Sequence, residues 1–272
     1  MLGGPCTDSS PSAPEVLEVM KLEVEEALAL APPTGPLEVL TCPDGKGGEA
    51  TFYILGTAHA SEASCRDAAA LIRLVRPDIV MDVTLGQVLA AIAGGQVPPF
   101  AGVYGWLLAK KGKELRIVPG AEFRAAMRAA HEVGAKVALG DRPISITLAR
   151  TWHALSLREK LSLVTSMLWT GLAPANPDKL KEDIEHMKET DVTERALEGF
   201  AKDFPSIVRP LLTERDEYMV YIMREKLAPR WRTHVVVVGA GHLKGIREKW
   251  EAKFDFDEIM RMPKERHARD EH

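Results

Sequence analysis

Short apolar runs and helix-like stripes alternate along the first part of the chain. Strand-like runs occur at residues 37–41 and 50–55, and the Pro-Asp-Gly-Lys-Gly-Gly segment between them is typical of a turn, so a hairpin is predicted. A helical stripe follows over residues 61–75, and another strand-like run covers residues 79–84. A strand, a helix and a strand in this spacing form a βαβ unit, so the strands at 50–55 and 79–84 should lie parallel.

The second part of the chain is mainly helical until one very apolar strand. A helix is predicted at residues 122–132, a strand at 136–139, and a helical insertion over residues 144–228. The run Thr-His-Val-Val-Val-Val at 233–238 suits a central strand that is covered on both faces. The predicted fold class is therefore α/β, with a mixed, largely parallel central sheet, flanking helices and a helical insertion before the last strand.

Composition separates the ends of the chain from its centre. Residues 1–36 are rich in proline, serine and acidic side chains, and we expect a flexible acidic segment with an amphipathic helix at residues 15–30. Residues 37–263 form the folded domain, and residues 264–272 are a charged tail. The 272 residues are enough for one large domain with a substantial core.

Charge, cysteine content and hydropathy exclude several classes of protein. The net charge of −4 offers no basic face to phosphates, so no nucleic-acid partner is expected. Three widely spaced cysteines favour a reducing compartment over a disulfide framework. The amino terminus lacks the features of a signal peptide, and no stretch reaches the roughly 18 apolar residues of a membrane span. We therefore expect a cytoplasmic protein without an integral membrane segment.

Two strand-like runs end in the same short motif, Gly-x-x-His. Residues 56–59 follow the run at 50–55, and residues 239–242 follow the run at 233–238. Ligands in open α/β sheets bind at the carboxyl ends of the strands, which is where both motifs fall. Two histidines and a carboxylate would suit zinc, manganese or cobalt, and such a metal can polarise a carbonyl or activate water. Alternatively, each glycine only permits a turn and each histidine caps a helix.

A third strand end carries charged residues. Asp141 and Arg142 follow the run at 136–139 and precede Pro143. They either join the two histidines at the edge of the sheet or form a salt-bridged start to the next helix, which Pro143 would suit. The residues themselves leave both interpretations open.

Several segments together resemble the TraB/PrgY/gumN family, and most of all its eukaryotic TraB domain-containing branch. They are YILGTAHAS, RPDIV, GAEFRAA, LGDRPI, LLTERDEYM and VVVVGAGHLKGI, and they occur in a consistent order over about residues 37–263. The resemblance implies a TraB-like domain over that range, with its site at the Gly-x-x-His turns.

The resemblance also implies which residues form the site. His59 and His242 correspond to the metal ligands, and Asp82 is a candidate third ligand. The other implied positions are Glu122, Asp141, Arg142, Glu214, Arg215 and Asp216. Glu122 or Glu214 would act as general base, and Arg142 and Arg215 complete the catalytic set. Three consecutive helical residues cannot all face one way, so we expect Glu214 or Arg215 to reach the site, and Asp216 or its neighbour to pair locally.

The strand at 79–84 departs from the family pattern. The family has a Val-Glu-Leu-Cys run there with an arginine shortly beyond, whereas this chain has Val-Met-Asp-Val-Thr-Leu-Gly-Gln. The glutamate position is Val83, and Asp82 points to the opposite face of a regular strand. The unbroken alternation predicts that Val83 faces the site, and only a bulge would turn Asp82 towards it.

Two functions follow from the resemblance. One is a regulatory or adaptor protein with a degenerate metallohydrolase-like site, which the altered strand favours. The other is an active metal-dependent peptidase, which the intact turns favour, since the distantly related Tiki proteins are metal-dependent proteases with two such motifs. The expected cofactor is divalent manganese, cobalt or zinc, and the expected partners are a peptide or protein substrate and a protein at an organelle membrane. Peripheral association with the mitochondrial outer membrane or the endoplasmic reticulum is expected from the eukaryotic branch.

Overall fold

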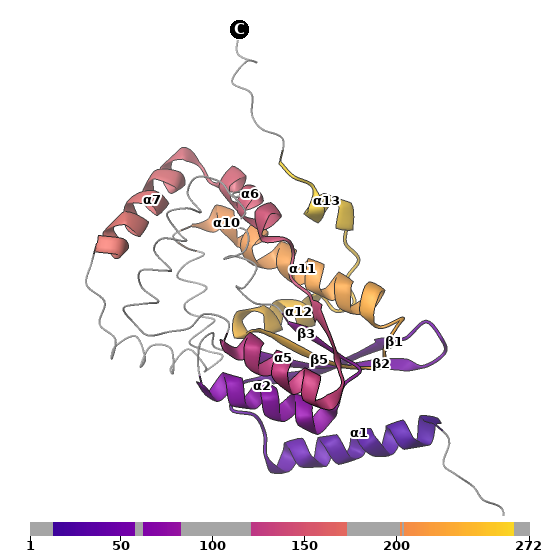
Figure 1. Ribbon diagram of the computed structural model, residues 1–272. Coiled ribbons are helices and arrows are strands. Elements are labelled where there is room, and N and C mark those ends of the chain that lie inside the picture. Colours follow the sequence, from indigo (N-terminus) through magenta and orange to yellow (C-terminus); the bar gives the residue numbers. More distant parts are fainter. Residues whose placement is uncertain (1–12, 58–61, 83–120, 173–201, 203, 264–272) are drawn as a thin grey trace, which may run out of the picture. The chain divides into compact units, whose positions relative to one another are not determined.

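The computed structural model describes residues 13–57, 62–82, 121–172, 202 and 204–263, and its internal contacts divide the chain into two units, Met1–Pro33 and Thr34–His272. The first unit contains helix α1 (Ala13–Leu30; Figure 1), at the place where the amphipathic helix was predicted. None of the helices in the described ranges is both long and apolar enough to cross a membrane.

In the described part of the second unit, five strands form one sheet in the order β1-β2-β5-β3-β4. They are β1 (Leu37–Pro43), β2 (Glu49–Thr57), β3 (Ile79–Asp82), β4 (Lys136–Leu139) and β5 (Thr233–Gly239). Strand β1 is antiparallel to β2, and the other pairs are parallel. This confirms the predicted α/β class, the hairpin and the parallel relation of β2 to β3. However, β5 lies between β2 and β3, so the two strands of the βαβ unit do not pair directly.

The β1–β2 hairpin is held by the Asp44 side chain in its turn. Asp44 Oδ1 accepts hydrogen bonds from the backbone N–H groups of Lys46 at 2.7 Å and Gly48 at 2.8 Å. These two bonds hold the pKa of Asp44 below its usual value. Gly45 and Gly47 adopt φ angles of 71° and 87°, a left-handed region that glycine enters without strain. The turn predicted from its composition therefore has a physical basis in these residues.

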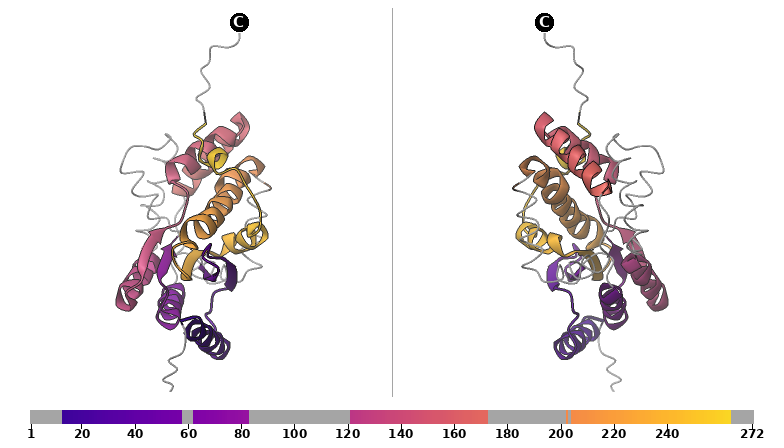
Figure 2. Two further views of the ribbon diagram at one scale, coloured as in Figure 1. Left: turned by 90° about the vertical axis from the view of Figure 1, so that its right-hand side faces the viewer. Right: turned by 90° about the vertical axis from the view of Figure 1, so that its left-hand side faces the viewer.

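Helices cover both faces of the sheet (Figures 1 and 2). Helices α2 (Glu62–Val75) and α5 (Ala121–Val133) pack side by side on one face. On the other face lie α11 (Glu214–Tyr221), the π-helical segment η2 (Ile222–Leu227) and α12 (Leu243–Lys249). A core cluster on this second face includes Phe52, Ile54, Met81, Val236, Val238, Met219, Met223, Leu243, Ile246 and Trp250. Strand β5 is therefore covered on both faces, which explains its unbroken apolar run.

The predicted helical insertion is present in the described residues before β5. Its described elements are α6 (Ile144–Ala154), α7 (Leu157–Leu172), α10 (Pro205–Val208), the π-helical segment η1 (Arg209–Thr213), α11 and η2. The Glu214 N–H donates to the Arg209 carbonyl, five residues earlier, as in a π-helix. The Ala228 N–H likewise donates to the Met223 carbonyl at 2.9 Å. Residues 205–227 thus form one helical run whose phase shifts at two places.

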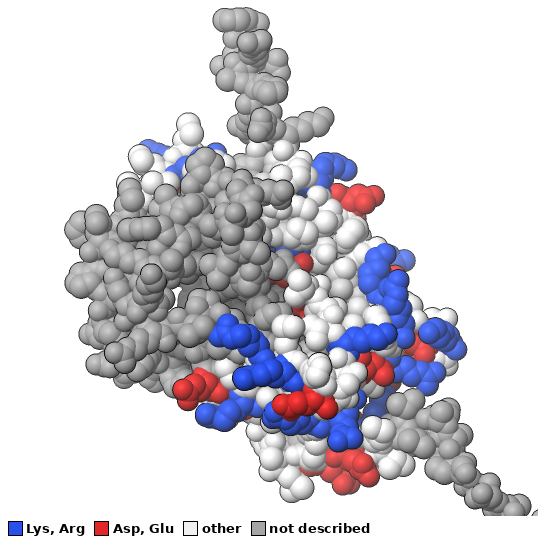
Figure 3. Space-filling view, viewed as in Figure 1, with Lys and Arg blue, Asp and Glu red and all other residues white. Residues whose placement is uncertain are grey.

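Charged side chains of both signs are mixed on the surface seen in Figure 3. Arg73 Nε lies 2.8 Å from Glu132 Oε2, which joins α2 to α5, and Arg66 lies 3.9 Å from Glu62 within α2. More than half of each of these side chains is exposed, so water and salt screen both pairs. The pairs are therefore solvated surface contacts.

His234 is fully buried near the start of β5. Its ring stacks on Phe52 with 4.0 Å between the ring centroids and 12° between the ring planes. Its Nδ1 donates a hydrogen bond to the Thr51 carbonyl at 3.1 Å, because a carbonyl can only accept. Burial lowers the pKa of His234 below its usual value of 6.5, since the buried ring resists taking a charge.

The stability of the fold is expected to fall with pH below about 6.5 because of His234. Its folded pKa lies below its unfolded pKa, so the unfolded chain takes up the proton first. The contribution is complete above the unfolded pKa and is lost at about 1.4 kcal/mol per pH unit as the pH falls towards the folded pKa. Chemical denaturation of wild type and His234→Phe from about pH 7.5 to about pH 5 measures the difference. Equal pH dependence in the two proteins would contradict the assignment.

Candidate functional site

The carboxyl ends of the parallel strands lie at one edge of the sheet. The register pairs Asp82 of β3 with Val237 of β5 and with Leu139 of β4. It also pairs Thr57 of β2 with Gly239 of β5. The chain segments that follow β2, β4 and β5 therefore leave the sheet at the same edge, where ligands bind in open α/β sheets.

Three of the predicted site residues follow these strand ends in the described structure. His242 comes three residues after the end of β5, and Asp141 and Arg142 come directly after the turn that ends β4. They lie at the same edge of the sheet, as predicted. His59 follows β2 by two residues and lies outside the described residues. The shared edge of β2 and β5 is thus established, and the convergence of the two imidazoles stays a prediction.

His242 pairs with Asp216 of α11. It ends the 3-10 turn η3 (Ala240–His242), and only 8% of its side chain is exposed. Its Nδ1 lies 2.6 Å from Asp216 Oδ1, and Lys249 Nζ of α12 lies 3.6 Å from Asp216 Oδ2. Asp216 or its neighbour was expected to pair locally, and Arg215 does so through the Leu211 carbonyl. Both partners of Asp216 come from elements that follow β5 in the chain. Asp216 instead connects α11 to the residue that follows β5.

Arg215 pairs with Asp141, the first charged residue after β4. Its Nε and Nη2 donate to the two carboxylate oxygens of Asp141 at 3.0 and 2.7 Å, and its Nη1 donates to the Leu211 carbonyl at 3.2 Å. Asp141 Oδ1 also accepts the backbone N–H of Arg142 at 2.7 Å. Arg215 thus contacts the first charged residue after β4, and Glu214 contacts the second, Arg142. Asp141 forms a salt bridge near the start of α6, but its partner belongs to α11.

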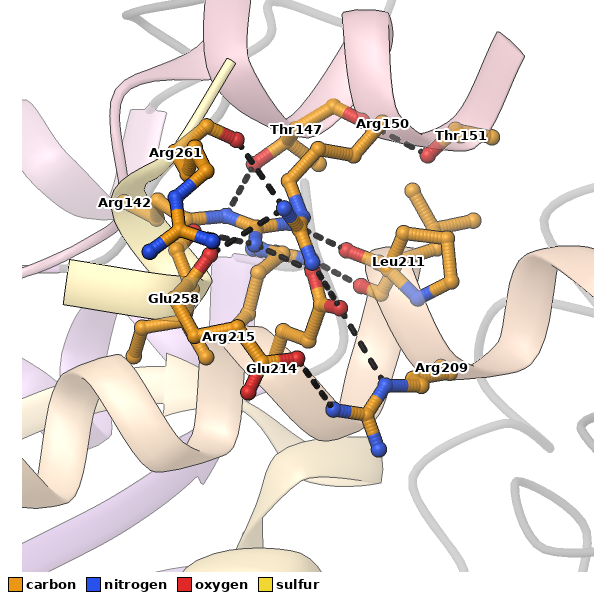
Figure 4. A network of polar contacts seen from close by, with 12 residues as sticks. Arg142, Thr147, Arg150, Thr151, Arg209, Leu211, Glu214, Arg215, Glu258 and Arg261 are labelled. Carbon is orange, nitrogen blue, oxygen red and sulfur yellow. Dashed lines mark hydrogen bonds and ion pairs between the residues drawn. The ribbon is translucent and has the colours of Figure 1, made fainter. Parts of the chain in front are cut away.

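Arg142 is buried at the centre of a polar network (Figure 4), with 1% of the residue exposed. Its Nη1 donates to Glu214 Oε2 at 2.5 Å and to the Ile259 carbonyl at 3.1 Å. Its Nε donates to Thr147 Oγ1 at 3.0 Å, and its Nη2 donates to the Pro210 carbonyl. Every nitrogen of the guanidinium therefore has a partner, and the network joins the β4–α6 turn to η1, α11 and α13 (Phe256–Met260).

Glu214 contacts two arginines in addition to Arg142. Arg150 donates to both of its carboxylate oxygens at 2.7 Å, and Arg209 Nε lies 3.3 Å from Oε1. Burial raises the pKa of Glu214, but the hydrogen bonds from Arg150 and Arg142 outweigh it, so the pKa lies below its usual range. A carboxylate in this state is a weak proton acceptor. The geometry therefore favours an ion-pair role for Glu214 and leaves Glu122 as the candidate general base.

Asp82 continues the regular alternation of β3. Ile79 and Met81 belong to the core cluster that contains residues of α11, so Asp82 lies on the other face of the strand. The register with β4 and β5 runs unbroken from Ile79 to Asp82, so the described strand contains no bulge. Asp82 is 1% exposed, and Val83 lies outside the described residues.

The described residues do not by themselves complete a metal site. Glu122 lies in the first turn of α5, but the described structure does not extend to its side chain. Among the side chains that the structure does describe, no three histidines, cysteines or acidic residues lie close enough together to hold a metal. Of the three predicted ligands, His242 and Asp82 lie in the described part of the chain.

Two partners of the site, Arg150 and Lys249, were missed by the sequence reasoning. Arg150 lies on α6 and donates to Glu214, and also to the Glu258 and Arg261 carbonyls at 3.1 and 2.9 Å. No motif marks either residue. An arginine or lysine on a surface helix usually keeps its charged group in water, so neither was expected to have a buried partner. Only the packing of α6 against η1 and of α12 against α11 shows that they belong to the site.

Comparison with known proteins gives a family and several relatives. A model described as the TraB/PrgY/gumN family matches residues 107–252. A TraB domain-containing protein of Mus musculus is 30% identical over 305 residues, covering 97% of this chain and 78% of the mouse protein. One of Bos taurus is 32% identical over 253 residues, covering 78% of this chain and 65% of the bovine protein. An uncharacterized protein of Methanocaldococcus jannaschii is 26% identical over 217 residues, covering 73% of this chain and 53% of that protein. The chain thus spans only part of the length of these relatives.

Proposed function

The chain belongs to the TraB/PrgY/gumN family, and we propose that it is a regulatory or adaptor protein with a metallohydrolase-like site at its strand ends. The site would be formed by the two Gly-x-x-His turns, with His59 and His242 as ligands of manganese, cobalt or zinc. The parallel pairing of β2 with β5 carries the proposal. It sets Thr57 opposite Gly239, so the two turns leave neighbouring strands at one edge.

The chemistry of His242 fits a ligand of such a metal. Its imidazole is buried, and one ring nitrogen contacts the Asp216 carboxylate at 2.6 Å. Histidines that bind metals usually present their second ring nitrogen to a carboxylate, a carbonyl or water in this way. A bound metal would supply a Lewis acid that polarises a carbonyl or activates water.

The β3 strand supports a degenerate site over a complete one. Two neutral histidines hold a divalent metal weakly, and an anionic ligand normally completes the set. Val83 stands at the family's glutamate position, and Asp82 lies on the face of β3 opposite the core cluster of α11. The site would then keep its shape and bind its metal weakly, which suits a regulatory or adaptor role. Glu122 is the residue that would substitute for the missing anion.

An active metal-dependent peptidase is the second candidate function. The intact ion pairs of the other family positions favour it, because Arg215 holds Asp141 and Arg142 holds Glu214. In that case Glu122 would act as general base on a peptide substrate. Glu214, Arg142 and Arg215 would keep α11 in register with the strand ends.

The family also suggests where the protein works. We propose a cytoplasmic location with peripheral association to the mitochondrial outer membrane or the endoplasmic reticulum through a protein partner. Fractionation of cells that express the tagged chain, with and without a high-salt wash of the membranes, tests this. A chain that stays entirely in the supernatant before the wash would overturn the membrane part of the proposal.

Metal analysis of the purified chain distinguishes the two functions. The wild type should hold less than one metal per chain, and Val83→Glu should bind roughly 10–100-fold more tightly because it restores an anionic ligand. Adding His59→Ala or His242→Ala to Val83→Glu should abolish this gain. Adding His153→Ala, at an exposed position on α6, should leave it unchanged.

The outcomes of this experiment separate the readings. Full metal occupancy of the wild type together with peptide hydrolysis would overturn the regulatory proposal and support the peptidase. Failure of Val83→Glu to bind any metal would overturn the metal site itself.

A further inference from the structure

We propose that Asp216 is a positioning residue for His242. It holds the imidazole with its proton on Nδ1, so that Nε2 carries the lone pair with which the ring can bind a metal or accept a proton. The proposal deepens the proposed function and rests on it only for the identity of the group that Nε2 meets. Its own basis is the packing of α11 against α12 and the turn that follows β5.

The contact between the two side chains determines where the ring proton lies. Both are nearly enclosed, with 8% of the His242 side chain and 6% of the Asp216 side chain exposed. Asp216 Oδ1 lies 2.6 Å from Nδ1, which is the short distance of a hydrogen bond to a charged acceptor. An ionised carboxylate can only accept, so Nδ1 must carry the proton. In the neutral ring the lone pair is therefore on Nε2.

A glycine on α12 makes room for this carboxylate. A Cβ atom at Gly245 would lie 2.0 Å from Asp216 Oδ2 and 2.7 Å from its Cγ, which is closer than atoms can approach. Gly245 follows His242 by three residues and lies on the same face of the helical turn. The absence of a side chain at Gly245 is therefore a condition for Asp216 to reach His242.

The partners of Asp216 differ from those of the other acidic residues in the region. In the described structure, Glu214 and Asp141 are each bound by an arginine fork that joins two elements. Asp216 instead contacts an imidazole, and its second oxygen lies 3.6 Å from Lys249 Nζ. Lys249 balances the charge of the carboxylate without taking the oxygen that holds the ring. This arrangement orients a histidine, whereas the arginine forks join α11 to α6 and to the turn that follows β4.

Two substitutions test the proposal on the full chain. Asp216→Asn keeps the size of the side chain but allows an amide N–H to face Nδ1, which would move the ring proton to Nε2. Gly245→Ala changes neither Asp216 nor His242 chemically, but its added Cβ displaces the Asp216 carboxylate. Asp257→Asn on α13 and Glu248→Ala on α12 are exposed controls.

The first measurement determines which ring nitrogen of His242 carries the proton in the metal-free protein. Nitrogen NMR of the histidine-labelled chain at about pH 8 reports this position. We expect the proton on Nδ1 in the wild type and in both controls, and a shift towards Nε2 in Asp216→Asn and Gly245→Ala. The second measurement is titration with zinc alone. We expect roughly 10–100-fold weaker binding in the two test variants than in the wild type.

The two measurements can contradict this inference and the proposed function independently. An unchanged ring proton in Asp216→Asn, with zinc affinity equal to that of the wild type, would overturn the role of Asp216 while leaving the metal site standing. Absence of zinc binding in the wild type and in Val83→Glu, with the ring proton still dependent on Asp216, would overturn the proposed function and leave this inference standing. A lower melting temperature of Asp216→Asn, without a change in the position of the ring proton, would mean that Asp216 only supports the packing of α11. This outcome would also overturn the inference.

Discussion

Replacement of Glu214 by alanine is expected to destabilise the protein by about 3–5 kcal/mol. Arg142 is 1% exposed and has Glu214 as its charged partner, so the substitution would leave a buried guanidinium facing carbonyl and hydroxyl oxygens only. Burial already lowers the pKa of Arg142, which the hydrogen bond and the charge of Glu214 oppose. Arg150 and Arg209 would lose the same partner. The substitution would therefore leave the positive charges of the network without the carboxylate that compensates them.

Chemical denaturation measures this loss of unfolding free energy, and thermal denaturation measures the corresponding drop in melting temperature. In a unit of this size, 1 kcal/mol corresponds to roughly 2–4 °C in melting temperature, so a drop of about 6–20 °C is expected. Glu258→Ala is the matched control, because Glu258 also pairs with Arg209 but has 53% of its side chain exposed, and it should change the stability by less than about 0.5 kcal/mol. Similar losses in the two variants would contradict a buried network.

The contribution of Glu214 also has a definite pH dependence. Its folded pKa lies below its unfolded value near 4.5, so the contribution is complete above about pH 4.5 and is lost as the pH falls through the folded pKa. The difference between wild type and Glu214→Ala should therefore shrink in acid and stay constant near neutrality.

Replacement of Phe52 by alanine is expected to cost about 3–5 kcal/mol. Phe52 is fully buried at the centre of β2, stacked on His234 and edge-on to Trp250 with 5.4 Å between the ring centroids. Its loss removes the apolar area of one ring and leaves a cavity where β2 meets β5. Because that pairing sets Thr57 opposite Gly239, the substitution should also loosen the strand ends.

Denaturation of Phe52→Ala, together with hydrogen exchange of the β2–β5 amides, checks this expectation. The amides of both strands should exchange faster, since their protection follows the global stability. Val39→Ala on β1, where the side chain is 45% exposed, is the control and should change the stability by less than about 0.5 kcal/mol. A loss below about 1 kcal/mol in Phe52→Ala would show that the ring is not part of the core.

Most of the local structure could be predicted from the sequence, because it depends on residues that are close together in the chain. The turn between β1 and β2 follows from Asp44 and the glycines after it, whose bonds and φ angles involve only that loop. The run at 136–139 was predicted with the same bounds that β4 has. The apolar run of β5 indicated a central strand, since only a strand covered on both faces tolerates such a sequence.

The polar partners of the site could not be predicted in the same way. Arg142 and Glu214 are 72 residues apart, and Asp216 and His242 are 26 residues apart. Their pairing depends on the direction in which α11 crosses the strand ends and on the helices that surround it. The π-helical segment η1 shifts the phase of the helix just before Glu214, so a period of 3.6 residues does not give the directions of the three acidic and basic residues that follow.

The sequence by itself therefore determined the elements, the α/β class and the edge of the sheet at which Asp141, Arg142 and His242 lie, because periodicity and turn chemistry act over a few residues. Only the tertiary structure decided that β5 inserts between β2 and β3, that Glu214 is neutralised by arginines, and that Asp216 reaches His242. These outcomes depend on which helix faces pack together and on the space that a glycine such as Gly245 leaves between them. That information is distributed over residues far apart in the chain, and no local pattern contains it.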